Sequence, residues 1–235
     1  SDVCSSDLHY EEFYRCLDRM QSCYVDITVG KLSGPIGDKK GFLAETEEMA
    51  LSYLGLRPCP SATQVIPRDI YANFFMTFSG IANAIERLAT NIRALQREEI
   101  GELEEYYDVK NQQGSSSMPH KRNPVLCENL CGIARMIRHH AYILNENTIL
   151  WDQRDISNSS VERITCPDIS NLTHFSILRM TEVLKSLSVN KERMQENLDK
   201  AAKVSGSSKL LTDLIKNGYS RQEAYELVKK QTQCK

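Results

Sequence analysis

The segment 114–124 gathers several residues that could carry out chemistry. It reads Gly-Ser-Ser-Ser-Met-Pro-His-Lys-Arg-Asn-Pro. Proline is tolerated in the first turn of a helix, so Pro124 predicts a helix start that places Lys121 and Asn123 at the positive end of the helix dipole. Positive potential at that place would suit a bound carboxylate. Composition alone favours a plainer alternative, a Ser-rich surface loop without chemistry.

A second polar cluster lies at 154–163 and reads Arg-Asp-Ile-Ser-Asn-Ser-Ser-Val-Glu-Arg. The guanidinium groups of Arg154 and Arg163 could each form bidentate bonds to phosphate oxygens. The alternative is ordinary surface ion pairing with the carboxylates of Asp152, Asp155 and Glu162. Trp151, which precedes the cluster, is expected in the core rather than at a ligand.

The overall composition indicates a globular protein without a nucleic-acid or membrane partner. The chain has 29 Lys and Arg against 31 Asp and Glu, so any anion site must be local. No apolar run approaches the ~18 residues of a membrane span, and the start lacks the apolar run of a signal peptide. We therefore expect a cytoplasmic location.

The cysteines favour reduced thiols over a metal site. There are eight of them without a paired spacing. Cys127 and Cys131 are four residues apart, but neither a histidine nor a second cysteine pair lies nearby in sequence to complete a zinc site. We expect neither a metal nor a cofactor.

Helical periodicity dominates the elements that must position these clusters. From Ile70 to Leu95 the apolar residues step by three or four, close to the 3.5-residue repeat of a long helix in a bundle. Further helices are expected at 9–25, 45–54, 123–146 and 168–187, with loops at 108–122 and 147–167. No alternating β-branched run argues for a sheet. The predicted class is all-α, a bundle of long helices.

The character of the sequence changes after Asn190. Shorter helices are expected at 191–203, 208–217 and 220–230, with Gly206 and Gly218 as stops. Ser220 and Glu223 fit a capping box. The predicted organisation is a tail at 1–8, a partial central helical-bundle domain at 9–190, and the start of a smaller C-terminal helical domain at 191–235.

The segment 114–124 resembles the signature loop of the fumarase and aspartase superfamily, whose members eliminate fumarate or a related acid. Within it, the chain from about residue 9 resembles the adenylosuccinate lyases. The matching stretches are 29–34, 63–64, 68–69, the signature loop with Glu128, and 154–163. The last stretch separates it from fumarase and argininosuccinate lyase. The resemblance implies β-elimination of fumarate from adenylosuccinate, giving AMP, and from the succinylated aminoimidazole carboxamide ribotide.

The resemblance assigns roles within the signature loop residue by residue. Ser115 is the general base and Ser116 a substrate contact. A serine hydroxyl is a poor base in water, so Ser115 needs an environment that stabilises its alkoxide, which Lys121 can supply. Lys121 and Asn123 match the carboxylate-binding pair, and Glu128 orients the general acid.

The resemblance also implies substrate-binding residues outside the loop. They are Gln64 and the phosphate-binding group Arg154, Ser159 and Arg163. The glycine-rich loop 30–37 adds Lys31 and Ser33, which either reach the active site or are structural.

In this family the general acid is a histidine in a threonine-rich motif upstream of the signature loop, and each active site draws on three subunits of a homotetramer. The chain contains no such motif. The resemblance therefore implies a fragment that lacks the N-terminal part and the end of the C-terminal domain, with little or no activity alone. Two alternatives remain: another superfamily lyase, such as argininosuccinate lyase, and a non-catalytic helical scaffold.

Overall fold

The structure is a computed structural model that describes residues 3–38, 44–108, 114, 117–118, 121–152 and 154–233. The chain divides into two compact units. The bundle unit comprises Asp2–Ala94 and Glu105–Leu187, and the terminal unit comprises Leu95–Glu104 and Ser188–Lys235. Among the described residues, no helix combines the length and apolarity that crossing a membrane requires.

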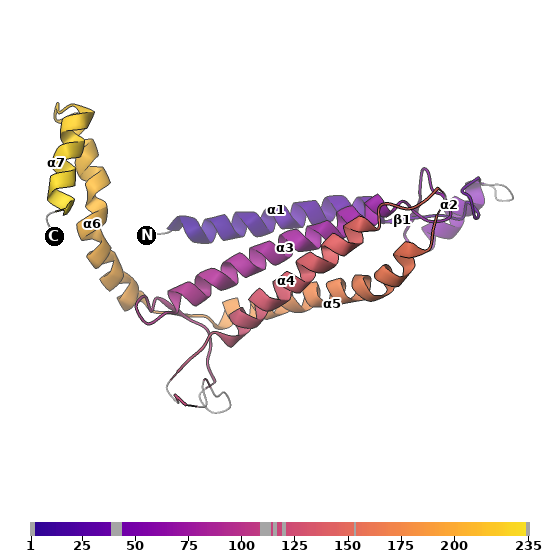
Figure 1. Cartoon of the computed structure of the whole chain (residues 1–235), viewed down its shortest axis with the longest axis horizontal. Helices are drawn as coiled ribbons and strands as arrows, with labels where there is room; N and C mark the ends of the chain where they lie inside the picture. Colours follow the sequence, from indigo (N-terminus) through magenta and orange to yellow (C-terminus); the bar gives the residue numbers. More distant parts are fainter. Residues whose placement is uncertain are drawn as a thin grey trace. The chain divides into compact units, whose positions relative to one another are not determined.

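Long helices lie side by side in the bundle unit (Figure 1). The helices of this unit are α1 (Val3–Ile27), α2 (Ala44–Ser52), α3 (Arg68–Leu95), α4 (Val125–Glu146) and α5 (Ser157–Ser186). The apolar repeat of α3 faces α4 and α5, and the buried residues include Ile85, Ile92, Leu130, Ile137, Ile169 and Val183. Each such side chain contributes about 1.5–3 kcal/mol when fully buried. The predicted all-α bundle is confirmed.

Two helix starts differ from the prediction. α1 begins at Val3, so the start expected at residue 9 is wrong; polar residues continue a helix where neither Pro nor Gly interrupts it. α5 begins at Ser157 and runs through Pro167, although a loop was expected up to that point. Burial of Thr165 and Ile169 on either side of the proline offsets the lost backbone hydrogen bond.

Two short sheets that the sequence pattern does not predict connect loops of the chain. In the bundle unit, β1 (Val29–Gly30) pairs parallel with β2 (Arg57–Pro58). In the terminal unit, β3 (Leu103–Glu104) pairs antiparallel with β4 (Ser188–Val189). The first sheet brings the loop after residue 30 beside the loop that leads into α3.

The terminal unit is a helical hairpin of α6 (Lys191–Lys216) and α7 (Arg221–Gln233). α6 continues through Gly206, so the predicted stop there is wrong; a glycine weakens a helix by about 1 kcal/mol without ending it. Gly218, with φ 96°, follows the end of α6. The capping box is confirmed, since the Ser220 amide donates to Glu223 Oε2 at 3.0 Å and the Glu223 amide donates to Ser220 Oγ at 3.3 Å.

Candidate active site

The predicted phosphate-binding residues lie around the N-terminus of α5. Arg154 Nη1 donates a long hydrogen bond of 3.5 Å to Gln64 Oε1, across 90 residues of sequence. One turn into the helix, Arg163 Nε donates to Ser159 Oγ at 3.3 Å. We call Gln64, Arg154, Ser159 and Arg163 the anion cluster. A helix N-terminus with two guanidinium groups suits a phosphate.

The carboxylates nearest to the anion cluster are engaged elsewhere. Arg68, only 8% exposed, binds both oxygens of Glu162 at 3.0 and 3.1 Å. Asp155 accepts from the Ser157 hydroxyl and from the amides of Ser157 and Trp151, and these bonds hold the pKa of Asp155 below its ordinary value.

Both arginines of the cluster therefore keep unused donors. Within the part of the chain that the structure describes, neither Arg154 nor Arg163 forms an ion pair with a carboxylate. Arg154 Nε is buried and has no hydrogen-bond partner among those residues. The described residues thus contain no salt bridge of the kind that the alternative requires, although Asp155 still interacts electrostatically with Arg154.

Trp151 is 79% exposed, so its expected place in the core is wrong. The bond from its amide to Asp155 closes a tight turn at 3.0 Å, and Asp152 within that turn adopts φ 42°. The indole therefore lies outside the bundle, shortly before Arg154 in the sequence.

Part of the signature loop lies outside the described residues, including Ser115 and Ser116. At the base of the loop, Asn123 Nδ2 donates to the Gly114 carbonyl at 2.8 Å. A Cβ at residue 114 would overlap the Lys121 carbonyl oxygen, so the close approach requires glycine. The two ends of the signature segment are therefore held together, with the Lys121 side chain exposed.

The helix α4 begins directly after Pro124, as predicted, but its first amides are already occupied by partners within the chain. The amides of Leu126 and Cys127 donate to the two oxygens of Glu105 at 2.8 and 2.9 Å. The Glu128 amide donates to the Pro124 carbonyl, and the Glu128 side chain is exposed. A substrate carboxylate here would depend on side chains such as Lys121.

The ammonium group of Lys31 is fully hydrogen-bonded to backbone carbonyls. Its Nζ donates to the carbonyls of Gly34 and Thr63 at 2.6 Å and of Gln64 at 3.0 Å, which uses all three ammonium protons. This favours the structural alternative for Lys31, which fixes the backbone that presents Gln64. Ser33 is buried, and its hydroxyl has no hydrogen-bond partner among the described residues.

The structure does not bring the signature loop and the anion cluster together within one chain. The loop leads into the start of α4, whereas the anion cluster surrounds the start of α5, which runs in the opposite direction (Figure 1). The 22 residues of α4 lie between them, a length of about 33 Å at 1.5 Å per residue. One small substrate cannot contact both groups of a single chain.

In the described part of the chain, the remaining cysteines, histidines and acids form no metal site. Six cysteines, at positions 16, 23, 59, 127, 131 and 166, are free thiols. Among the described residues, no group of three His, Cys, Asp or Glu could hold a metal ion. His139 and His174 are exposed on helices, and His9 is buried with Nε2 at 2.8 Å from Asn91 Nδ2.

Residues 6–138 match the model of a family described as lyase, and this range is more than half of the chain. The chain belongs to this lyase family. It is 43% identical over 221 residues to the adenylosuccinate lyase of Thermotoga maritima, covering 94% of this chain and 51% of that protein. With the adenylosuccinate lyase of Streptococcus mutans it shares 40% identity over 223 residues, covering 95% and 51%. The chain thus spans about half the length of the curated relatives it matches.

Solved structures agree in fold. The fumarate lyase of Mesorhizobium sp. BNC1 superposes with a TM-score of 0.79 at 22% identity, covering 94% of this chain and 49% of that one. The class II fumarase of Schistosoma mansoni gives a TM-score of 0.77 at 19% identity, covering 95% and 50%. These likenesses support the helical-bundle fold.

Proposed function

We propose that this chain supplies part of the active site of an adenylosuccinate lyase in purine nucleotide biosynthesis, in the cytoplasm. The reaction releases fumarate from adenylosuccinate to give AMP, and from the succinylated aminoimidazole carboxamide ribotide. The observation that carries the proposal is the anion cluster, in which Arg154 lies beside Gln64 and Arg163 beside Ser159, and neither guanidinium forms a salt bridge among the described residues. The 40–43% identity to named adenylosuccinate lyases supports it.

The chemistry needs a base, an acid and fixed cations. A base removes a proton from the succinyl carbon beside a carboxylate, and an acid protonates the departing nitrogen. Because that carbon acid is weak, donors placed beforehand must stabilise the dianionic intermediate. We assign Ser115 as the base, with Ser116 as a substrate contact and Glu128 to orient the acid. Lys121 and Asn123 receive the substrate carboxylate.

The separation of the two parts supports an active site shared between chains. Since about 33 Å of α4 divides the signature loop from the anion cluster, a complete site would take its loop from one subunit and its phosphate residues from another. A homotetramer built on the bundle meets this requirement.

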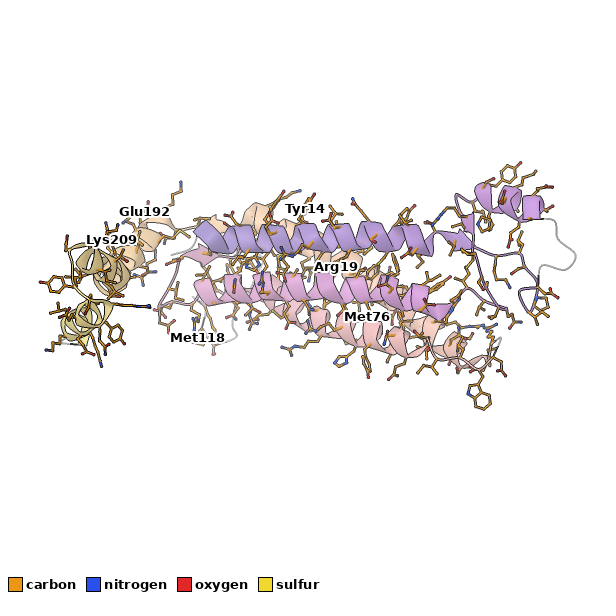
Figure 2. The ribbon with its side chains drawn as sticks, turned by 90° about the horizontal axis from the view of Figure 1, so that it is seen from above. Tyr14, Arg19, Met76, Met118, Glu192 and Lys209 are labelled. Atoms are coloured by element: carbon orange, nitrogen blue, oxygen red, sulfur yellow. The ribbon has the colours of Figure 1, made fainter. Side chains whose placement is uncertain are left out.

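An apolar groove on the bundle unit offers a contact surface for a second copy. It has a volume of about 380 Å³, and its walls include Phe13, Leu17, Met20, Ile177 and Leu184 from α1 and α5. Tyr14 and further large apolar side chains also stand exposed on α1 (Figure 2). Contiguous apolar surface of this kind is typical of an interaction site.

Leu17→Glu is expected to break the oligomer, because it places a charge in the groove that the second copy would fill. Burial of a leucine contributes about 1.5–3 kcal/mol, so the dissociation constant should rise at least roughly tenfold. Analytical ultracentrifugation measures it. Leu54→Glu, an exposed leucine outside the groove, is the control. Unchanged assembly of Leu17→Glu would count against this surface.

AMP binding tests the anion cluster directly. Arg154→Gln or Arg163→Gln should each weaken AMP binding roughly 10- to 100-fold, because a charge-assisted hydrogen bond contributes about 1.5–3 kcal/mol. Equilibrium dialysis of the chain gives the affinities. Arg135→Gln, an exposed arginine on α4, should leave them unchanged. Absence of AMP binding to the unaltered chain would instead favour a lyase for an unphosphorylated substrate, such as argininosuccinate, or a non-catalytic scaffold.

A further inference from the structure

Glu105 is a buried acid that no step above requires. It is 2% exposed, and its carboxylate accepts from the amides of Leu126 and Cys127 at 2.8 and 2.9 Å. Burial raises the pKa of the Cys127 thiol, and a hydrogen bond with Glu105 raises it further, so this thiol stays protonated and adds a third contact. A carboxylate at a helix N-terminus is stabilised by the helix dipole, which offsets the cost of burying it.

Glu105 acts as a remote cap for α4. The first amides of a helix need partners from outside the helix, and within the described residues Pro124 provides no side-chain cap. The partner comes instead from 21 residues upstream. The segment between Glu105 and α4 contains the whole signature loop, so this contact joins the two ends of the segment that carries the loop.

Two further contacts join residues inside the same segment, nearer to the signature loop. Asn123 Nδ2 donates to the Gly114 carbonyl, and Gly114 packs against the Lys121 carbonyl. Both contacts depend on the position of the residues that enter α4. If the first turn of α4 moved, Lys121 and Asn123 would move with it.

We propose that Glu105 is a positioning residue for the signature loop. By occupying the amides at the start of α4, it fixes the place from which Lys121 reaches the substrate. It also keeps the helix N-terminus closed to anions, so that recognition of the succinyl carboxylate falls to the Lys121 side chain. The role of Lys121 in recognising the succinyl carboxylate rests on the proposed function, whereas the capping of α4 by Glu105 does not.

Amide hydrogen exchange on the full chain tests the cap. In Glu105→Gln the amide group presents a donor to one of the two α4 amides, so Leu126 and Cys127 should exchange at least tenfold faster, while Ile137 and Leu144 deeper in α4 keep their protection. Glu47→Gln is the matched control, since Glu47 is also buried (3% exposed) and accepts from the Leu32 amide at 2.8 Å. It should leave Leu126 and Cys127 unchanged.

Glu105→Asp keeps the charge but is one methylene shorter, so it should bond one amide and show intermediate exchange; it replaces Glu105→Gln if that variant does not fold. Unchanged exchange at Leu126 and Cys127, or uniformly faster exchange along α4, would overturn the proposal.

Ligand affinities separate this inference from the proposed function. Glu105→Gln should weaken adenylosuccinate binding at least fivefold and leave AMP binding within twofold, because AMP lacks the succinyl carboxylates. An equal loss for both ligands would overturn the positioning role. If the unaltered chain binds neither ligand, the proposed function fails, and the exchange experiment still decides the role of Glu105 at α4.

Discussion

Replacing Arg68 with methionine should lower the free energy of unfolding by about 3 kcal/mol. Removing one partner of a buried ion pair typically costs 3–5 kcal/mol, because the other charge stays buried without compensation. The lower end applies here, since Glu162 is 21% exposed and keeps a bond from Asn158 Nδ2 at 3.0 Å. The variant also loses the packing of the guanidinium over the Tyr71 ring at 4.1 Å.

Urea unfolding followed by circular dichroism measures this loss. Arg138→Met is the control, because Arg138 and Glu86 form a more exposed pair that should contribute less than about 1 kcal/mol. Adding Glu162→Leu to Arg68→Met should recover most of the stability, since the uncompensated charge is then gone. Equal losses for Arg68→Met and Arg138→Met would show that burial of this pair does not matter.

The same pair explains how the anion cluster is presented. Glu162 and Asn158 lie one turn apart on α5, as do Ser159 and Arg163, on the adjacent face. With Glu162 held inward by Arg68, Ser159 and Arg163 remain available to a ligand. Arg68→Met should therefore also weaken AMP binding, although Arg68 is not part of the cluster.

The fold was predictable where the information is local. The steps of three and four between apolar residues on α3 depend only on helix geometry, and the capping box at Ser220 spans a single turn. Local rules failed at Pro167, where burial of Thr165 and Ile169 stabilises the helix around the proline, and at Gly206, where one glycine costs too little to end a helix. Propensity is a weak signal against tertiary contacts.

For the candidate site, the sequence nominates individual residues but not their arrangement in space. Resemblance selected Gln64 and Arg154, but their contact across 90 residues comes only from the structure. Arg68 and Glu105 were missed as positioning residues, because their partners lie 94 and 21 residues away. No spacing rule links residues that far apart. The sequence signals that could have pointed to them are weak: Glu105 is an acid before a loop, and Arg68 is an arginine at the start of a helix.

Ser115→Ala is expected to have the largest effect on activity. A general base contributes about 10²–10⁴-fold to the rate, so turnover should fall by that factor while substrate still binds. The test enzyme is a chimera in which this chain replaces the matching half of the Thermotoga maritima adenylosuccinate lyase, about half of that protein. Release of fumarate from adenylosuccinate is followed by ultraviolet absorbance. Near-normal turnover of the variant would remove Ser115 as the base.

Mixing two impaired chimeras, assayed below the substrate concentration that the weaker binder needs, then tests whether the site is shared between chains. One carries Ser115→Ala in the loop, and the other carries Arg154→Gln in the anion cluster. If loop and cluster come from different subunits, random assembly leaves about one quarter of the sites with both intact groups. Mixing Ser115→Ala with Lys121→Met, two changes in the same loop, should restore nothing. Because α4 separates loop from cluster by about 33 Å, a failure of the first mixture to recover would contradict the shared site more directly than any single variant.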